Sequence, residues 1–425
     1  MADGQVLESP YLPLVEPSLM PAWLDHVSRA RGVAPPRGEA GRYRYVDLGC
    51  GYGMVPLYLA ATHPDAILIG VDANPDHIDV AREVADRAGL ANVAFHCARF
   101  GDPELSAIQP VDYVAANGVY TWLPDEVRAL LVAQFRDLLV PGGTAMVGYN
   151  LMRGWLALLP IQRIIAQVHA DIGADDDADT FARSSALVEA VAESTNASIF
   201  RLGAETFAGV MKSSDPRYHV HEFLAPGWRP VWTGELAEAM ATAGCRYVGD
   251  LHLDRLRDDY ALNARQRALI ADAGSPEMEW LLRDLFWPRH YARGLFHRSA
   301  HGEGAEPPSR FAGWLRLKKP VGEVVYECKT AAGRLGFDSP LAREIVDWLA
   351  GGPADLATLA TEGGDADTVL ATLDALCMSG QAVPCDPPQA GNRVEALNRV
   401  IDDMELGIHA IADPHATPVP KKAKR

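Results

Sequence analysis

The sequence lacks any hydrophobic run long enough to cross a membrane, since none approaches the roughly 18 residues that a spanning helix needs. Its first residues, M-A-D-G-Q, show no signal-peptide pattern. It has six cysteines but no C-x-x-C pair, so neither a zinc site nor a disulfide framework is indicated. We therefore expect a cytoplasmic protein that has no membrane contact and no metal site.

Positive charge is also scarce. The chain has 39 Lys and Arg residues against 56 Asp and Glu residues, a formal net charge of −17, which argues against nucleic acid as the main partner. What the chain does have is length and apolar residues. Its 425 residues, of which 48% are hydrophobic, predict two or three domains with substantial cores.

The most informative stretch is Tyr43–Gly53, Y-R-Y-V-D-L-G-C-G-Y-G. It predicts a buried strand, a loop with closely spaced glycines, and then a helix over Met54–Thr62. Such glycines are typical of a sharp turn or of a backbone that a ligand approaches closely. A second apolar strand, Ile67–Val71, ends in Asp72. A carboxylate about 20 residues beyond a glycine loop is placed to accept hydrogen bonds from ribose hydroxyls.

The glycine spacing is G-x-G-x-G, whereas the dinucleotide fingerprint is G-x-G-x-x-G. Asp47 precedes the loop; this acid would repel a pyrophosphate but suits an ammonium or sulfonium group. The motif D-L-G-C-G-Y-G resembles motif I of class I methyltransferases, which bind S-adenosylmethionine (SAM). Cys50 inside the loop is interpreted as a small space-filling residue rather than a nucleophile. A glycine-rich turn without a ligand is the alternative.

Further strands and helices alternate after Asp72. Asn74 and Gly89 are suited to cap a helix at its two ends, and later strands are predicted at Val93–His96, Val111–Ala116 and Thr144–Asn150. This alternation predicts an α/β fold of the class I methyltransferase (Rossmann-like) type, with a doubly wound parallel sheet. Ligands bind such sheets at the carboxyl ends of the strands.

Several later stretches carry a more specific resemblance. N-G-V-Y-T-W-L-P-D-E-V (117–127), L-V-P-G-G-T-A-M-V-G-Y-N (139–150) and Gly154-Trp155 resemble bacterial methyltransferases that contain a methyltransferase regulatory domain, a family that includes protein-lysine methyltransferases. Pro216–Leu224 resembles the signature of that domain. The resemblance extends to about Pro418. It implies a SAM-dependent methyltransferase with SAM as its cofactor.

The resemblance and the strand ends together nominate the cofactor-binding residues. At the position that usually cradles the adenine, the family carries an acidic or small polar residue, and this sequence has Arg99. Phe100 either stacks on the base or belongs to the core, and Tyr11 is either a lid residue or a turn tyrosine. The full set is Tyr11, Asp47, Gly49, Cys50, Gly51, Gly53, Asp72, Ala73, Arg99, Phe100, Asn117 and Gly118.

The same reading divides the chain into six parts. Residues 1–40 form an N-terminal lid segment, 41–150 the SAM-binding core, 151–230 a helical insertion that is a cap or a dimer contact, 231–300 the remainder of the core, 310–390 a winged-helix-like module, and 391–425 a C-terminal helix with a basic tail. In the fourth part we expect a helix at Thr233–Gly244 and strands at Arg246–Leu253 and Arg293–His297.

A mechanism follows from the donor that the resemblance implies. A lysine acceptor must lose a proton, which from a reference pKa near 10.4 costs roughly 4–5 kcal/mol at pH 7. Desolvation and a neighbouring sulfonium charge both lower that pKa, so no strong general base is required. Tyr120, Trp122 and Tyr149 are each either a wall of an amine channel or a core residue, and Asn117 or Asn150 is a candidate for accepting hydrogen bonds from the amine.

Three functions remain open. The first is methylation of a protein, at the side-chain amine of lysine. The second is N- or O-methylation of a small molecule under residues 151–230, and the third is a non-catalytic SAM-binding scaffold, for which Arg99 is the sequence hint. A nicotinamide-dependent oxidoreductase is disfavoured by the glycine spacing. A homodimer is possible.

Overall fold

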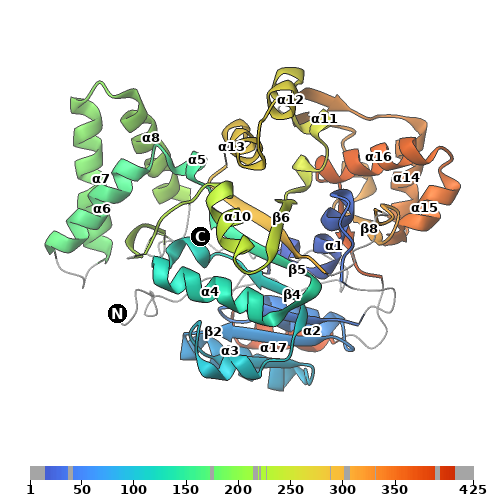
Figure 1. Ribbon diagram of the computed structural model, residues 1–425, viewed down its shortest axis with the longest axis horizontal. Coiled ribbons are helices and arrows are strands. Elements are labelled where there is room, and N and C mark those ends of the chain that lie inside the picture. The colour runs from blue at the N-terminus through green and yellow to red at the C-terminus, as the bar shows by residue number, and fades with distance from the viewer. Residues whose placement is uncertain are drawn as a thin grey trace.

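The computed structural model describes residues 15–36, 42–172, 177–213, 219, 222–225, 227–287, 289–300, 307–330, 332–387 and 393–406. At its centre is a seven-stranded sheet in the order β3-β2-β1-β4-β5-β7-β6, in which β7 runs antiparallel to both of its neighbours (Figure 1). The strands are β1 (Arg44–Leu48), β2 (Ile67–Asp72), β3 (Val93–Cys97), β4 (Val111–Ala116), β5 (Leu139–Asn150), β6 (Cys245–Asp250) and β7 (Tyr291–Arg298). This order confirms the predicted class I methyltransferase fold.

Helices cover both faces of the sheet because successive strand residues point to opposite sides. Tyr45 of β1 faces a core cluster that includes residues of α1 (Pro21–Ala30), α2 (Met54–Thr62) and α3 (Pro75–Ala88). Val46, the next residue, faces a second cluster with α4 (Asp125–Leu138) and α10 (Thr233–Ala241). A parallel strand buried on both sides reads as a continuous apolar run, which is why these strands were visible in the sequence.

The predicted ends of α3 are confirmed. The Asn74 side chain accepts a hydrogen bond from the backbone N–H of Asp76 at 3.0 Å, and Gly89 closes the helix in the left-handed region at φ 66°. The prediction for the start of β5 was less accurate. The strand was expected at Thr144–Asn150, but β5 begins at Leu139, and its register with β4 shifts before pairing resumes at Thr144.

Residues 151–213 form a helical arm that leaves the sheet after β5 (Figure 1, left). The arm contains α5 (Met152–Trp155), α6 (Leu159–Ile172), α7 (Asp177–Ser194) and α8 (Ser198–Ser213). It has its own apolar cluster, in which Ile161 and Ile165 of α6 are fully buried. Helices α6, α7 and α8 therefore pack chiefly on one another.

The chain then returns to the sheet. After α10 and β6 come η4 (Leu253–Arg255), α11 (Asp258–Ala261), α12 (Ala264–Ala271) and α13 (Pro276–Phe286), followed by β7. Thr233 links α10 to α13. Its backbone N–H and its hydroxyl both donate to the Asp284 carboxylate, at 2.9 and 2.6 Å. The expected helix, sixth strand and seventh strand are thus confirmed.

The C-terminal module contains three α-helices and several short strands among the described residues. Its elements are β8 (Trp314–Leu317), η5 (Val321–Glu323), β9 (Glu327–Thr330), β10 (Gly333–Gly336), α14 (Pro340–Ala350), β11 (Ala354–Asp355), α15 (Leu356–Glu362), α16 (Ala366–Met378) and β12 (Ala382–Cys385). Strand β12 pairs with β8, which precedes the helices in the chain. The likeness to a winged helix stays a prediction.

Two segments distant in sequence complete the body. Helix α17 (Val394–Asp403) packs on α2 and α3 through Val394, Leu397, Val400 and Ile401. Near the other end, η1 (Pro17–Leu19) leads into α1, where Trp23 donates from Nε1 to the carbonyl of Leu251 at 2.8 Å. Among the described residues, no helix is both long and apolar enough to span a bilayer.

Candidate active site

The glycine loop Gly49–Gly53 joins β1 to α2, and its three glycines have different roles. All three have positive φ, at 78°, 53° and 68°, which disfavours other residues. A Cβ at Gly49 would clash with Val119, and one at Gly53 would clash with Phe95. A Cβ at Gly51 would meet nothing within 4 Å. The backbone of Gly51 therefore faces open space that a ligand can occupy.

Asp72, at the carboxyl end of β2, holds this loop in place. Its Oδ2 accepts a hydrogen bond from the backbone N–H of Gly51 at 2.8 Å, and its Oδ1 accepts one from the N–H of Asn74 at 2.9 Å. Each carboxylate oxygen retains a further lone pair. Asp72 can thus fix the loop and still accept a ribose hydroxyl, so the structure brings together the two features on which the sequence prediction rested.

Asp47, two residues before the loop, is buried at 5% exposure. Burial and, to a lesser extent, the negative charge of Asp72 together raise the pKa of its carboxyl to about 7. Two carboxylates in one low-dielectric site favour a cation between or beside them. The sulfonium and the ammonium of SAM are both cations.

The residues present therefore fit SAM. Asp72 would accept the ribose hydroxyls, the open backbone at Gly51 would admit the ligand close to the main chain, and Asp47 would balance the positive charge. Cys50 has the space-filling role expected of it. Its thiol lies against Gly70 in β2, and burial raises the pKa of this thiol well above its usual range, so it stays protonated.

A polar pair lies beyond β4. Asn117 follows the strand, and its Oδ1 accepts a hydrogen bond from the hydroxyl of Tyr291, the first residue of β7, at 2.9 Å. Tyr291 reaches Asn117 across Gly148 of β5, where any Cβ would clash with its hydroxyl. Gly118 has φ 69° and lets the chain turn away. Tyr291 was missed in the sequence, and the only available signal was Gly148 in an otherwise apolar strand.

The residues expected near the adenine divide into two groups. Arg99 is partly exposed at the carboxyl end of β3, and its backbone N–H donates to Asp102 at 2.8 Å. Phe100 is buried in the core cluster that also contains Leu105 and Leu131, which corresponds to the core alternative left open above. Ala73 follows Asp72 at the same strand edge. Tyr11 lies outside the described residues.

Two of the proposed channel residues prove to be core residues. Tyr149 is fully buried, and its hydroxyl is hydrogen-bonded to that of Thr233 at 2.7 Å, so it faces α10 rather than a channel. Tyr120, in η3 (Tyr120–Trp122), is buried under the Arg128 guanidinium, 5.3 Å from its ring centre. Strand alternation turns the ring of Tyr149 inward and η3 turns that of Tyr120 inward, which corresponds to the core alternative for these two residues. Trp122 is half-buried and stays a candidate.

Asn150 has a different partner from the one expected. It is buried, and its side-chain amide donates to the carboxylate of Glu222, which also accepts from the indole of Trp228 at 3.1 Å. The backbone N–H of Asn150 donates to the Thr121 hydroxyl at 3.2 Å. Asn150 therefore joins β5 to residues beyond the helical arm through its amide nitrogen, and its role in accepting hydrogen bonds from an amine stays a prediction.

Two family models match the chain. Residues 46–143 match a methyltransferase domain, and residues 215–298 match a family described as a predicted methyltransferase regulatory domain. The first range contains the glycine loop, Asp72 and Asn117. The second contains Glu222, Trp228 and Tyr291, so the regulatory domain contributes strands β6 and β7 to the sheet.

Curated relatives cover different shares of the chain. An uncharacterised protein of Synechocystis, sll1526, is 24% identical over 84% of this chain and 71% of its own length. The Rickettsia prowazekii protein RP028 is 30% identical over 35% of the chain and 58% of its own length. A trans-aconitate 2-methyltransferase of Methylobacterium radiotolerans is 38% identical over 24% of the chain and 36% of its own length.

A solved structure shares the fold over most of the chain. PKMT2 from Rickettsia typhi, in complex with AdoHcy, superposes with a TM-score of 0.66 at 20% identity, covering 89% of this chain and 78% of the other. A second structure of the same protein gives 0.64 at 19% identity, over 88% and 76%. With the two family matches and a site that fits SAM, the chain is a class I SAM-dependent methyltransferase that carries a methyltransferase regulatory domain.

Proposed function

We propose that this methyltransferase transfers the methyl group of SAM to a protein acceptor, at the side-chain amine of a lysine. The observation that carries the proposal is the packing of the helical arm. Enzymes that methylate small molecules exclude water by closing over the substrate. Here α6, α7 and α8 bury their apolar residues against one another and stand apart from the sheet (Figure 1). That arrangement favours a large acceptor over an enclosed one.

The relatives support the same choice. The likeness to PKMT2 of Rickettsia typhi includes 89% of this chain, and the sequence resembles a family with protein-lysine methyltransferases among its members. Trans-aconitate 2-methyltransferases favour the alternative, a small-molecule acceptor. Their matches extend over 24–35% of the chain, and a methyltransferase core that binds SAM is common to both classes.

SAM supplies a methyl group on a sulfonium, and the residues of this chain would align the acceptor. We place the acceptor amine beside Asn117 and Tyr291, whose oxygens can accept hydrogen bonds from it. Holding the amine in this position makes the transfer effectively intramolecular. A partly buried site also lowers the pKa of the lysine, so that the neutral nucleophile is easier to form.

The arm itself is proposed as a homodimer contact rather than a cap. Leu187 of α7 and Ile199 and Leu202 of α8 are large apolar side chains exposed at 44%, 57% and 56%. Exposed apolar side chains on neighbouring helices are typical of protein contacts. Replacing Ile199 and Leu202 with glutamate should shift a dimer to a monomer in light scattering, and an unchanged mass would refute the proposal.

The acceptor is tested with SAM labelled at its methyl group. The protein is added to a lysate of a host strain without the gene, and acid-precipitable label is separated from soluble label, with Asp72→Ala as the control. We expect label in a discrete protein band that disappears with the control, and mass spectrometry then gives the modified residue. Label in the soluble fraction alone would show that the methyl acceptor is a small molecule.

A further inference from the structure

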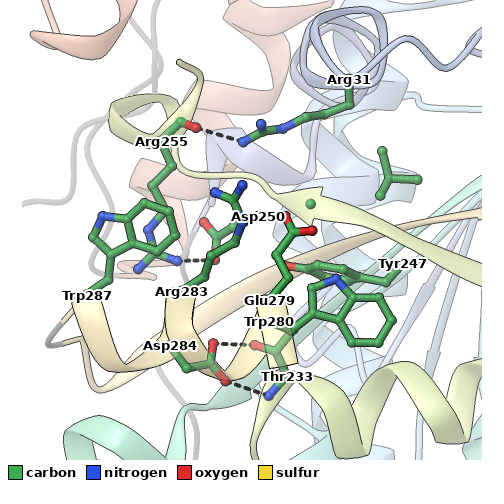
Figure 2. Close-up of a pocket in the computed structure, with 12 residues that line it drawn as sticks. Arg31, Thr233, Tyr247, Asp250, Arg255, Glu279, Trp280, Arg283, Asp284 and Trp287 are labelled. Carbon is green, nitrogen blue, oxygen red and sulfur yellow. Dashed lines mark hydrogen bonds and ion pairs between the residues drawn. The ribbon is translucent and has the colours of Figure 1, made fainter. Parts of the chain in front are cut away.

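A second hollow lies apart from the glycine loop, between α1, β6, η4 and α13 (Figure 2). Its volume is about 90 Å³. None of the residues assigned to the cofactor lines it. Three arginines from three segments surround it: Arg31 after α1, Arg255 in η4 and Arg283 in α13. Three carboxylates, of Asp250, Glu279 and Asp284, line the same space, so what matters is which of the arginine donors these acids leave without an acceptor.

Arg255 is the most deeply buried of the three, at 3% exposure. Its Nη1 donates to Asp250 Oδ2 at 2.9 Å, and its guanidinium stacks 4.4 Å from the ring centre of Trp287. Within the described part of the chain, its buried Nε and Nη2 have no hydrogen-bond acceptor. A buried guanidinium donor without an acceptor is unfavourable, since it loses its hydration without replacement.

Arg31 also has a buried donor without an acceptor among the described residues. Its Nη2 donates to the backbone carbonyl of Arg255 at 2.7 Å, whereas its buried Nε has no acceptor among the described residues. Burial lowers the pKa of Arg31, which is the direction expected for a desolvated cation. Figure 2 shows its guanidinium extending to the backbone carbonyl of Arg255. A counterion in the hollow would offset this desolvation.

The acceptors around the hollow already have donors. The Asp250 carboxylate accepts from Arg255 and from the backbone N–H of His252 at 2.8 Å. Asp284 accepts from Thr233 through both of its oxygens. Arg283 is held by Asp258 through two hydrogen bonds, at 2.8 and 2.7 Å, and by Glu279. The groups that lack a partner among the described residues are therefore N–H donors of two cations, Arg31 and Arg255.

The size of the hollow limits what can bind. The volume of about 90 Å³ exceeds the roughly 10–15 Å³ that a single water requires, so the hollow has room for a small group. A carboxylate or a phosphate suits it, because their planar or tetrahedral oxygens match guanidinium donors. The indole rings of Trp280 and Trp287 also line the hollow.

From these observations we propose that the hollow is a binding site for a small oxyanion, a carboxylate or a phosphate, held by Arg31 and Arg255. Arg31 belongs to the N-terminal segment, and Arg255, Trp280 and Arg283 lie in residues 215–298, which match the regulatory domain. The bound anion joins these two parts. The hollow is lined by none of the residues assigned to the cofactor.

The test is calorimetry of the full chain, saturated with S-adenosylhomocysteine to block the cofactor site. Sodium phosphate and sodium acetate are titrated separately, with sodium chloride at matched ionic strength as the blank. We expect one equivalent of phosphate or acetate to bind, and the anion that binds more tightly identifies the class. Tryptophan fluorescence should change on binding, because Trp280 and Trp287 line the hollow.

Arg31→Gln tests the assignment, because it keeps an amide donor but removes the charge. We expect at least about tenfold weaker binding, as for loss of a charge-assisted hydrogen bond. Arg246→Gln is the matched control; it makes the same charge change on an exposed residue of β6 and should bind normally. Arg31→Lys, which keeps the charge, should retain part of the affinity and guards against a folding defect in the glutamine variant.

Two results would overturn the proposal. The first is a folded wild-type protein that binds neither phosphate nor acetate above the chloride blank, which would mean that water alone fills the hollow. The second is equal loss of binding in Arg31→Gln and Arg246→Gln, which would place the effect in general surface charge. Binding that occurs without S-adenosylhomocysteine but not in its presence would assign the anion to the cofactor site and would equally refute the proposal.

Discussion

The side-chain amide of Asn150, at the carboxyl end of β5, donates a hydrogen bond to the buried carboxylate of Glu222. Asn150 ends the strand that leads out of the SAM-binding core, and Glu222 lies in the residues that match the regulatory domain. The same carboxylate accepts from the indole of Trp228. One buried acid thus joins the two parts of the chain beside the strand ends.

Replacing Glu222 with glutamine should lower the thermal stability. The substitution keeps the shape but removes the charge, and it places an amide where two donors converge, so we expect a loss of about 1–3 kcal/mol in the free energy of unfolding. Thermal and denaturant unfolding measure it. Glu238→Gln is the control, because Glu238 is exposed on α10. Equal effects of the two substitutions would contradict a structural role for this contact.

Gly51→Arg should abolish SAM binding in a folded protein. The arginine side chain would enter the space that the cofactor needs, and its charge would oppose the sulfonium. Gly51→Ala is the graded control. Its methyl group has room, so the cost is chiefly the φ of 53°, about 1 kcal/mol, and binding should weaken only modestly. Calorimetry with SAM measures both, and unchanged affinity in the arginine variant would refute the cofactor site.

Asp72→Ala should also abolish SAM binding, for two reasons that reinforce each other. It removes the acceptor for the ribose hydroxyls, and it leaves the backbone N–H groups of Gly51 and Asn74 without their carboxylate partner. We expect loss of binding in calorimetry while circular dichroism still shows a folded protein. Asp76→Ala, on the neighbouring exposed turn of α3, should bind SAM normally.

Asp47→Asn should raise stability while weakening SAM binding. Burial raises the folded-state pKa of Asp47 to about 7, above the ordinary value of 3.8, so ionising this group disfavours the folded state. The penalty is absent below pH 4, grows as the pH rises, and is complete above pH 7, with an upper limit of about 4 kcal/mol for this shift. The stability gain of the asparagine variant should therefore appear as the pH rises.

SAM affinity should show the matching pH dependence. A bound cation favours the ionised form of Asp47, so the wild-type affinity should fall as the pH drops below about 7 and should level off above it. In Asp47→Asn the affinity should be lower and should not respond to this titration. Calorimetry from acidic to alkaline pH measures the dependence. Identical profiles in the two proteins would show that Asp47 does not interact with the cofactor.

Tyr291→Phe should lower kcat more than it changes SAM binding. The variant keeps the ring over Gly148 but removes the hydroxyl that donates to Asn117, so the proposed site for the amine loses one oxygen and its alignment. We expect a decrease of about 10-fold to 100-fold in kcat, the range expected when one positioned polar group is lost. Tyr260→Phe, in α11, is the control. An unchanged kcat would remove Tyr291 from the site.

The sequence alone predicted the parts of this protein that depend on neighbours along the chain. The glycine loop, Asp72 and the capped helix α3 were visible because positive φ, strand ends and caps each require particular residue types at fixed local spacing. The strands were visible as apolar runs, since both faces of the sheet are covered. The order of alternation then determined the fold class.

Only the tertiary structure decided which distant residues meet. Tyr291 lies 174 positions from Asn117, and Glu222 lies 72 positions from Asn150, so no local pattern connects either pair. Tyr149 and Asn150 are neighbours in the chain, but their side chains bind different partners, Thr233 and Glu222, because successive strand residues point to opposite faces. Side-chain direction and long-range pairing depend on tertiary packing. A single sequence does not show which distant residues pack together.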